Sequence, residues 1–186
     1  MGIQVRDIIE NGKEILEIVN EKGEVLDQAP RDAIHGNNSL LHRVVHVVVR
    51  NGSGDILLQK RSASKDVAPG RWDTSVGGHV ALGETLGEAL QREAQEEIGV
   101  ACEKAVFMYT YIHRNAYESE IVSTYGCLYE GPFTLNKEEI DEIRFWSLEE
   151  IKNSLGKDIL SDNFEDEFKR TLQYKQQEGR LFSIRD

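Results

Sequence analysis

The chain has 186 residues, of which 39% are hydrophobic, and its 33 Asp and Glu outnumber its 22 Lys and Arg to give a formal net charge of −11. This length and hydrophobic content fit one domain with a core of ordinary size. The negative charge repels phosphate backbones and anionic lipids, which argues against a nucleic-acid polymer or a membrane surface as a partner.

Cysteine usage and targeting patterns indicate the compartment. Cys102 and Cys127 form no C-x-x-C pair and cannot make a disulfide framework, so we expect two buried thiols in a reducing environment. The first residues match no export signal, and Arg6 breaks the myristoylation pattern. The aliphatic runs are far shorter than the ~20 residues of a membrane span. We therefore expect a cytoplasmic protein with no membrane partner.

The first predicted element is a β-hairpin. Its strands cover residues 14–19 and 24–29, joined across a Gly-containing turn, and a short helical turn follows within residues 31–42. Unpaired strand edges are templates for pairing with another chain. This N-terminal lobe is therefore a candidate homodimer surface.

Strands and helices follow one another irregularly over the rest of the chain. Further strands are predicted within residues 42–61 (two, around a Gly-rich turn), 71–76, 105–113, 120–130 and 142–147. Helices are expected at about 86–98, from about 148, and, as a charged terminal helix, within 163–179. This irregular order fits an α+β fold better than a doubly wound sheet.

The helix predicted at about Leu86 to Ile98 has acidic residues on an unexpected face. Thr85 and Glu88 match a capping box, and Gly99 stands where a helix commonly ends. At about 100° per residue, the apolar side chains of this helix cover roughly half of its circumference. They are Leu86, Ala89, Leu90, Ala94 and Ile98. Glu93 and Glu97 fall within that apolar half, and Glu96 lies at its edge.

Charge runs on helices are usually solvated faces, but the phase of Glu93, Glu96 and Glu97 argues against that interpretation. Carboxylates on adjacent turns repel each other by roughly 2–3 kcal/mol per pair at an effective dielectric constant of 20. A divalent cation with oxygen ligands offsets this repulsion directly. The phase therefore predicts a metal site on this helix.

Gly78 and Glu84 extend the pattern upstream of the helix. Gly78, five residues, Glu84, seven residues and then the run 92–100 resemble the Nudix box, G-x5-E-x7-R-E-U-x-E-E-x-G-U, where U is a bulky aliphatic residue. Every polar position matches, and the one departure is Ala94 in place of a larger aliphatic. Residues 42–155 as a whole are similar to a Nudix domain.

The resemblance implies a Nudix-type α/β/α sandwich with a mixed β-sheet and, here, an N-terminal β-hairpin extension. Within a single domain over residues 1–186, we expect the extension at 1–41, the core at 42–155 and a C-terminal helix at 156–186. The implied activity is hydrolysis of a nucleoside diphosphate derivative or another small diphosphate, with Mg²⁺ or Mn²⁺ as cofactor.

The resemblance also implies roles for residues of the box. Glu93, Glu96 and Glu97, with the backbone carbonyl of Gly78, would hold the metal. Glu93 would also serve as general base.

The remaining implied roles are supporting ones. Arg92 would orient Glu93, and Glu84 would brace the loop. One more acid is expected to reach the metal from residues 136–147; Glu139 stands at the matching place, with Glu138 and Glu142 as close alternatives.

A second set of candidate ligands comes from similarity to the branch of the superfamily that includes isopentenyl diphosphate isomerase. The similar stretches are residues 24–49 and 68–80. The ligands implied at matching positions are His35, His42, His79, Glu118 and Glu120. Three imidazoles with two carboxylates suit Mn²⁺, Fe or Zn²⁺, although each His taken singly is more typical of a surface or core residue.

The position of the isomerase's catalytic cysteine is Gly77 in this chain. Isomerisation of an alkene needs two opposed acid–base groups, and glycine supplies none. Tyr111 and Glu120 match other isomerase positions but cannot replace the missing group. Hydrolysis is therefore the favoured prediction, with an isomerase-like enzyme or a non-catalytic nucleotide-binding module as the alternatives.

Overall fold

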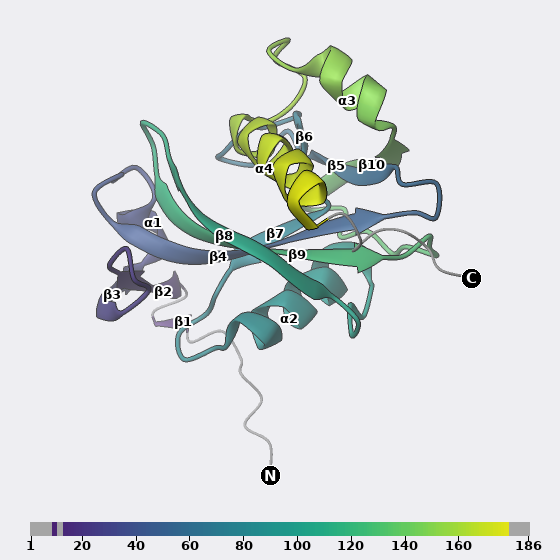
Figure 1. Ribbon diagram of the computed structural model, residues 1–186. Helices are drawn as coiled ribbons and strands as arrows, with labels where there is room; N and C mark the ends of the chain where they lie inside the picture. The colour runs from purple at the N-terminus through teal and green to yellow at the C-terminus, as the bar shows by residue number, and fades with distance from the viewer. Residues whose placement is uncertain (1–8, 11–12, 179–186) are drawn as a thin grey trace.

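The computed structural model describes residues 9–10 and 13–178, and these residues form a mixed β-sheet with helices on both faces (Figure 1). The strands are β1 (Ile9–Glu10), β2 (Lys13–Val19), β3 (Val25–Pro30), β4 (Leu41–Arg50), β5 (Ile56–Arg61), β6 (Trp72–Asp73), β7 (Val76–His79), β8 (Val106–Arg114), β9 (Ser119–Leu128) and β10 (Ile140–Trp146). The helices are α1 (Arg31–Ile34), α2 (Leu86–Ile98), α3 (Leu148–Ser154) and α4 (Asp162–Glu178). The predicted α+β class is confirmed.

The main sheet has the order β10-β5-β4-β9-β8, with β6 paired to β5 and β7 paired to β4. Strands β4 and β9 run parallel along their whole length, and the other pairs are antiparallel. Helix α2 covers one face of this sheet and α4 covers the other (Figure 1). The sandwich of layers expected from the sequence is therefore present.

The centre of the sheet splits between β4 and β5, which pair only at Arg50 and Ile56. Beyond that point Ser75 separates them, because its hydroxyl donates to the carbonyl of Leu57 and accepts from the amide of Val49. The single strand predicted at 71–76 is consequently two short strands, one on each side of the split. This separation makes room for a cavity inside the sheet.

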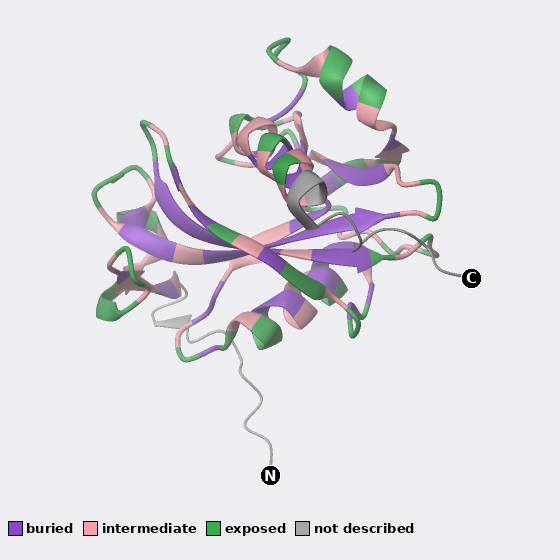
Figure 2. Ribbon diagram, in the orientation of Figure 1, coloured by how far each residue is buried: buried purple, intermediate pink, exposed green. Residues whose placement is uncertain are grey.

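Strand β4 contributes buried side chains to both faces of the sheet, because successive side chains along a strand point to opposite faces. Its Val47 and Val49 pack with the α2 side chains Leu90, Ala94 and Ile98. Figure 2 shows β4 buried over most of its length. Cys102 and Cys127 are buried thiols in the same cluster, as predicted.

Helix α4 is more than a charged terminal helix. Phe164 and Phe168 are each 1% exposed and pack against Val48, Ile56 and Leu58. Exposed charged residues such as Asp162 and Lys169 lie away from this buried face. Burying two aromatic side chains makes α4 part of the core rather than an attachment to it.

The predicted hairpin is formed by β2 and β3, which pair in antiparallel register from Ile15 and Pro30. Val19 of β2 packs against Leu41 and Ile121 of the main sheet. On β3, Leu26 is 66% exposed. A homodimer contact through this hairpin stays a prediction. None of the described helices is long and apolar enough to cross a membrane.

The Phe168→Ala variant tests whether α4 belongs to the core. Removing this buried ring should lower the free energy of unfolding by about 3–5 kcal/mol, because a cavity is left against the sheet. Lys169→Ala, at the next and exposed position, should change it by less than about 0.5 kcal/mol. Denaturant titration followed by circular dichroism measures both. Equal, small effects would mean that the core does not depend on α4.

Candidate active site

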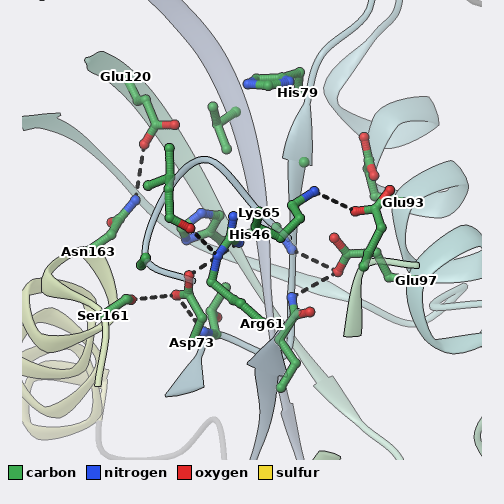
Figure 3. A pocket seen from close by; sticks show the side chains of 18 of the residues that line it. His46, Arg61, Lys65, Asp73, His79, Glu93, Glu97, Glu120, Ser161 and Asn163 are labelled. Atoms are coloured by element: carbon green, nitrogen blue, oxygen red, sulfur yellow. Dashed lines mark hydrogen bonds and ion pairs between the residues drawn. The ribbon is translucent and has the colours of Figure 1, made fainter. Parts of the chain in front are cut away.

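A cavity of about 890 Å³ lies where β4 and β5 separate. Its walls come from α2, from strands β4 to β7, from β9 and from the start of α4. In Figure 3 the carboxylates of Glu93 and Glu97 lie on one side, His46 lies in the middle, and Asp73 and Asn163 lie opposite. The predicted acidic helix therefore faces a hollow rather than open solvent.

The position of α2 against the cavity follows from its local sequence. Thr85 accepts a hydrogen bond from the Glu88 amide, and Glu88 accepts one from the Thr85 amide, so the predicted capping box is present. Gly99 ends the helix with φ of 69°, in the left-handed region that favours glycine. The helix bounds predicted from the sequence, Leu86 to Ile98, are confirmed.

Gly78 allows α2 to approach β7 closely. A Cβ atom at this position would overlap the carboxylate of Glu93, so only glycine fits. The glycine in the turn before the helix thus has a physical cause: a backbone without a side chain is packed directly against an acid. This contact places the backbone of Gly78 and the Glu93 carboxylate at one site.

Arg92 is the cation that organises the acidic helix. Its guanidinium contacts both carboxylate oxygens of Glu84 at 2.8 Å and the Glu93 Oε1 at 2.7 Å. It also donates to Glu96 at 3.2 Å and to the His79 carbonyl at 2.9 Å. Glu84 is 4% exposed and accepts from the amide of Ala81, so it holds the turn, and it does not line the cavity.

Glu97 forms no ion pair with another described residue. It is 5% exposed, and its Oε2 accepts hydrogen bonds from Gln59 Nε2 at 3.0 Å and from the Gly77 amide at 3.3 Å. Burial, together with the nearby charges of Glu93 and Glu139, raises the pKa of Glu97 to about 8. The ionised form is therefore disfavoured until positive charge enters the cavity.

Glu93 is in a similar state. Burial raises the pKa of Glu93 to about 7, although Arg92 acts in the opposite direction. The Glu96 side chain is 56% exposed and lies at the rim. The carboxylates of Glu93 and Glu97 are shielded from solvent, and nearby cations balance their negative charge only in part. With Glu96, their oxygen atoms are the kind of ligand that a hard divalent cation such as Mg²⁺ or Mn²⁺ prefers.

Glu139 is the acid from residues 136–147 that reaches the cavity. It lines the wall, forms a 3.0 Å ion pair with Lys65, and acts on the pKa of Glu97. Glu138 and Glu142 are exposed and are not among the lining residues. Of the three alternatives left open by the sequence, the geometry favours Glu139.

His35, His42 and His79 converge, as expected from the second pattern. One ring nitrogen from each lies within 4.8 Å of the others, and His35 Nε2 is 3.1 Å from His79 Nε2. Burial lowers the pKa of His35 to about 4 and that of His42 to about 2, with the neighbouring imidazoles adding to the effect. Both rings are therefore neutral at pH 7, which is the form that ligates metals.

The two predicted carboxylates lie beside this group. Glu118 Oε2 is 3.9 Å from His35 Nε2, and Glu120 Oε1 is 3.7 Å from His42 Nε2. Burial raises the pKa of Glu118 to about 7, and the charge of Glu120 adds to this. Both nitrogens of the fully buried His42 lack a hydrogen-bond partner among the described residues. An unsatisfied buried imidazole between two acids fits a bound cation.

Sequence reasoning missed several lining residues. Glu14 of the hairpin lies 3.3 Å from His79 Nδ1, and Asp73, Ser161 and Asn163 line the far wall. His46 was also missed, although it follows His42 by four residues on one strand, an even spacing that puts both side chains on the same face of the sheet.

Comparison with known proteins identifies the family of the chain. A family model for the NUDIX domain matches residues 40–168. The chain belongs to the Nudix family. The Nudix hydrolase YfcD of Escherichia coli (strain K12), described as uncharacterized, is 36% identical over 142 residues, covering 74% of this chain and 76% of YfcD. The chain is accordingly a hydrolase of this family.

Solved structures support the Nudix fold. The crystal structure of DR0079 from Deinococcus radiodurans has a TM-score of 0.72 and 27% identity, covering 84% of this chain and 98% of that one. The NUDIX domain of Shewanella oneidensis NrtR, crystallised with ADP ribose, has a TM-score of 0.59 and 16% identity, covering 78% and 92%. The second likeness concerns the fold alone.

Glu97→Gln tests the buried charge through the pH dependence of stability. The pKa of Glu97 is above its ordinary value of 4.5, so metal-free wild type should lose free energy of unfolding as pH rises from 4.5 through about 8. Glutamine keeps an acceptor for Gln59 without the charge. In EDTA, the variant should gain about 2–4 kcal/mol over wild type at pH 8 and little at pH 4.5.

Urea titrations at the two pH values measure this difference. Glu103→Gln is the matched control, because it removes a carboxylate from an exposed position; it should show no such gain. A Glu97→Gln variant that is less stable than wild type at pH 8 would contradict the assignment.

Proposed function

We propose that this Nudix hydrolase is a divalent-metal-dependent pyrophosphohydrolase that cleaves a small diphosphate by attack of water on phosphorus. The observation that carries the proposal is the pair of cavity-facing carboxylates, Glu93 and Glu97, whose pKa values are raised by burial even though Arg92 contacts Glu93. Glu93, Glu96 and Glu97, with the Gly78 carbonyl, would hold Mg²⁺ or Mn²⁺. When bound, the ion would withdraw charge from the phosphorus and favour attack by water.

The remaining roles belong to the protein's own groups. Glu93 accepts the proton of the attacking water, since it faces the cavity and its pKa lies near neutrality. Arg92 fixes the orientation of Glu93 through their 2.7 Å contact. Glu139 adds negative charge close to Glu97, and Lys65 keeps its side chain in place.

The substrate we favour is a nucleotide derivative. The Shewanella NrtR domain, which shares the fold, was solved with ADP ribose, so such a fold can hold two groups joined by a diphosphate. The cationic side chains that line this cavity suit the negative charge of a diphosphate. They include Arg31, Arg61, Lys65 and Arg71. We propose residues 62–69 and 114–119 as the loops that set substrate specificity, because binding contacts are commonly carried by surface loops.

Two alternatives remain less well supported. The isomerase-like branch is consistent with the histidine group, but Gly77 offers no acid–base group at the cavity, so alkene protonation has no partner on that side. A non-catalytic nucleotide-binding module would not need the complete acidic set that faces the cavity. A cytoplasmic location and homodimerisation are also proposals from the sequence.

A phosphate-release assay over a panel of nucleotides and small diphosphates, with and without Mg²⁺ or Mn²⁺, tests the proposal. Glu93→Gln, Glu96→Gln and Glu97→Gln should each lower metal-dependent activity by roughly 10²-fold or more, because each removes charge from the metal site. Glu103→Gln should retain activity. Isomerisation of isopentenyl diphosphate, without metal-dependent hydrolysis of any panel member, would favour the isomerase-like function over hydrolysis. Full activity in all three variants would show that the acidic cluster has no role in catalysis, as expected of charges that only contact solvent.

We also propose that His35, His42, His79, Glu118 and Glu120 bind a second metal that hydrolysis does not require. The double variant His42→Ala, His79→Ala should purify with less transition metal than wild type, since two of three imidazole ligands are gone. Elemental analysis measures the metal content, and the phosphate assay checks that hydrolysis persists. Unchanged metal content would rule out this second site. If metal is lost, Gly77→Cys then tests whether isomerase activity can be gained.

A further inference from the structure

His46 is a buried imidazole with one nitrogen left over. The residue is 5% exposed and lies on the α4 side of β4. Its Nδ1 is 3.1 Å from the Glu167 Oε1 of α4. Nε2 has no hydrogen-bond partner in the described part of the chain, yet it is not among the atoms sealed from solvent, and His46 lines the cavity. The free nitrogen therefore opens into the cavity.

Glu167 fixes both the orientation and the charge of this ring. Glu167 is completely buried, and Thr124 also donates to its Oε1 at 2.8 Å. Its only ion pair among the described residues is with His46. Burial alone would lower the pKa of His46, but the Glu167 carboxylate outweighs it and raises the pKa to about 9. With Nδ1 directed at Glu167, the ring presents Nε2–H as a fixed donor.

Gly77 is what exposes this donor. His46 and Gly77 are directly opposite each other in the β4–β7 pair, and a Cβ on Gly77 would lie 3.2 Å from His46 Nε2. The amide of the same glycine donates to Glu97. A single residue without a side chain thus separates the acidic metal site from the imidazole. A group attached to a diphosphate can reach His46 past Gly77.

The surroundings of Nε2 define what this group can be. Asp73 and Glu120 both act electrostatically on His46 from the cavity wall, so an anionic group would be repelled there. An oxygen that both accepts from His46 and donates to a carboxylate meets these demands, and a hydroxyl does both. No Phe, Tyr or Trp is found among the lining residues within the described ranges, so a base has no ring to stack on.

We infer that His46, reached through the space left by Gly77 and held by Glu167, is a binding residue that donates a hydrogen bond to a hydroxyl group on the non-phosphate part of the substrate. The inference rests on the proposed hydrolysis of a small diphosphate. It adds the chemical class of substrate that the site selects. Substrates with hydroxyl-bearing groups are bound, and those with hydrocarbon groups are discriminated against, because the latter leave the buried donor unpaired.

Steady-state kinetics on three diphosphates test this selection. ADP-ribose carries hydroxyl groups, isopentenyl diphosphate carries a hydrocarbon, and inorganic pyrophosphate carries neither. Wild type should have its highest kcat/KM on ADP-ribose. Gly77→Ala covers Nε2 without removing the His46–Glu167 pair. On ADP-ribose this variant should lower kcat/KM about 10–100-fold, mainly through a higher KM. On pyrophosphate the loss of kcat/KM should be smaller than that by roughly 10-fold or more.

Two further variants separate binding from folding. The double variant His46→Leu, Glu167→Gln removes the donor and its buried counter-charge together, and it should lose the same preference. Gly87→Ala on α2 is the matched control, because a Cβ there meets nothing within 4 Å; it should keep wild-type kinetics. Equal losses on all three substrates would contradict the inference.

A binding measurement decides the inference even without turnover. In protein labelled with ¹⁵N-histidine, an ADP-ribose analogue with a methylene bridge between its phosphorus atoms should shift the His46 Nε2 resonance, and Gly77→Ala should abolish the shift. A protein that hydrolyses none of the three compounds but gives this shift would refute the proposed hydrolysis alone. No shift on saturation with the analogue would refute the role of His46.

Discussion

The uncompensated burial of Glu97 is the constraint on which the rest of the site depends. Its carboxylate receives two hydrogen bonds and forms no ion pair within the described residues, while Arg92 serves Glu84, Glu93 and Glu96 instead. A buried carboxylate without a counter-ion destabilises a fold. The apolar side of α2 offsets this cost by packing on β4 and β7, and the remaining deficit of positive charge is the basis of the proposed cation site.

The separation of β4 from β5 converts this deficit into a usable site. Had the two strands paired along their length, the acids of α2 would face a closed sheet. At the split, the Ser75 hydroxyl pairs with the amide of Val49 on β4 and the carbonyl of Leu57 on β5, so these two backbone groups keep a partner where the strands separate. The cavity then reaches from α2 to the start of α4, with the acids of α2 on one side and the His46 imidazole in the middle.

The sequence predicts the parts of the site that are local in the chain. Thr85, Glu88 and Gly99 define α2, and helical phase alone places Glu93 and Glu97 on its buried side, because these effects act over one or two turns. The choice of Glu139 over Glu138 and Glu142 could not be made this way, since it depends on which side chain of an irregular loop faces the cavity.

Contacts between distant segments set the other half of the site. His46 and Glu167 are separated by 121 positions, and Glu14 meets His79 from the N-terminal hairpin. The charged composition of α4 also hid Phe164 and Phe168, whose packing brings Glu167 under the sheet. No periodicity in the sequence encodes which strand a terminal helix will cover, so these residues become visible only in the folded chain.

The central claim is that α2 presents buried carboxylates that ionise when a divalent cation binds. Calorimetric titration of metal-free protein with Mg²⁺ at pH 7, repeated in two buffers of different ionisation enthalpy, counts the protons released on binding. Because the pKa values of Glu93 and Glu97 are raised to about 7 and about 8, the account predicts release of about one proton or more per protein molecule. Binding without proton release, or no binding at millimolar Mg²⁺, would contradict it.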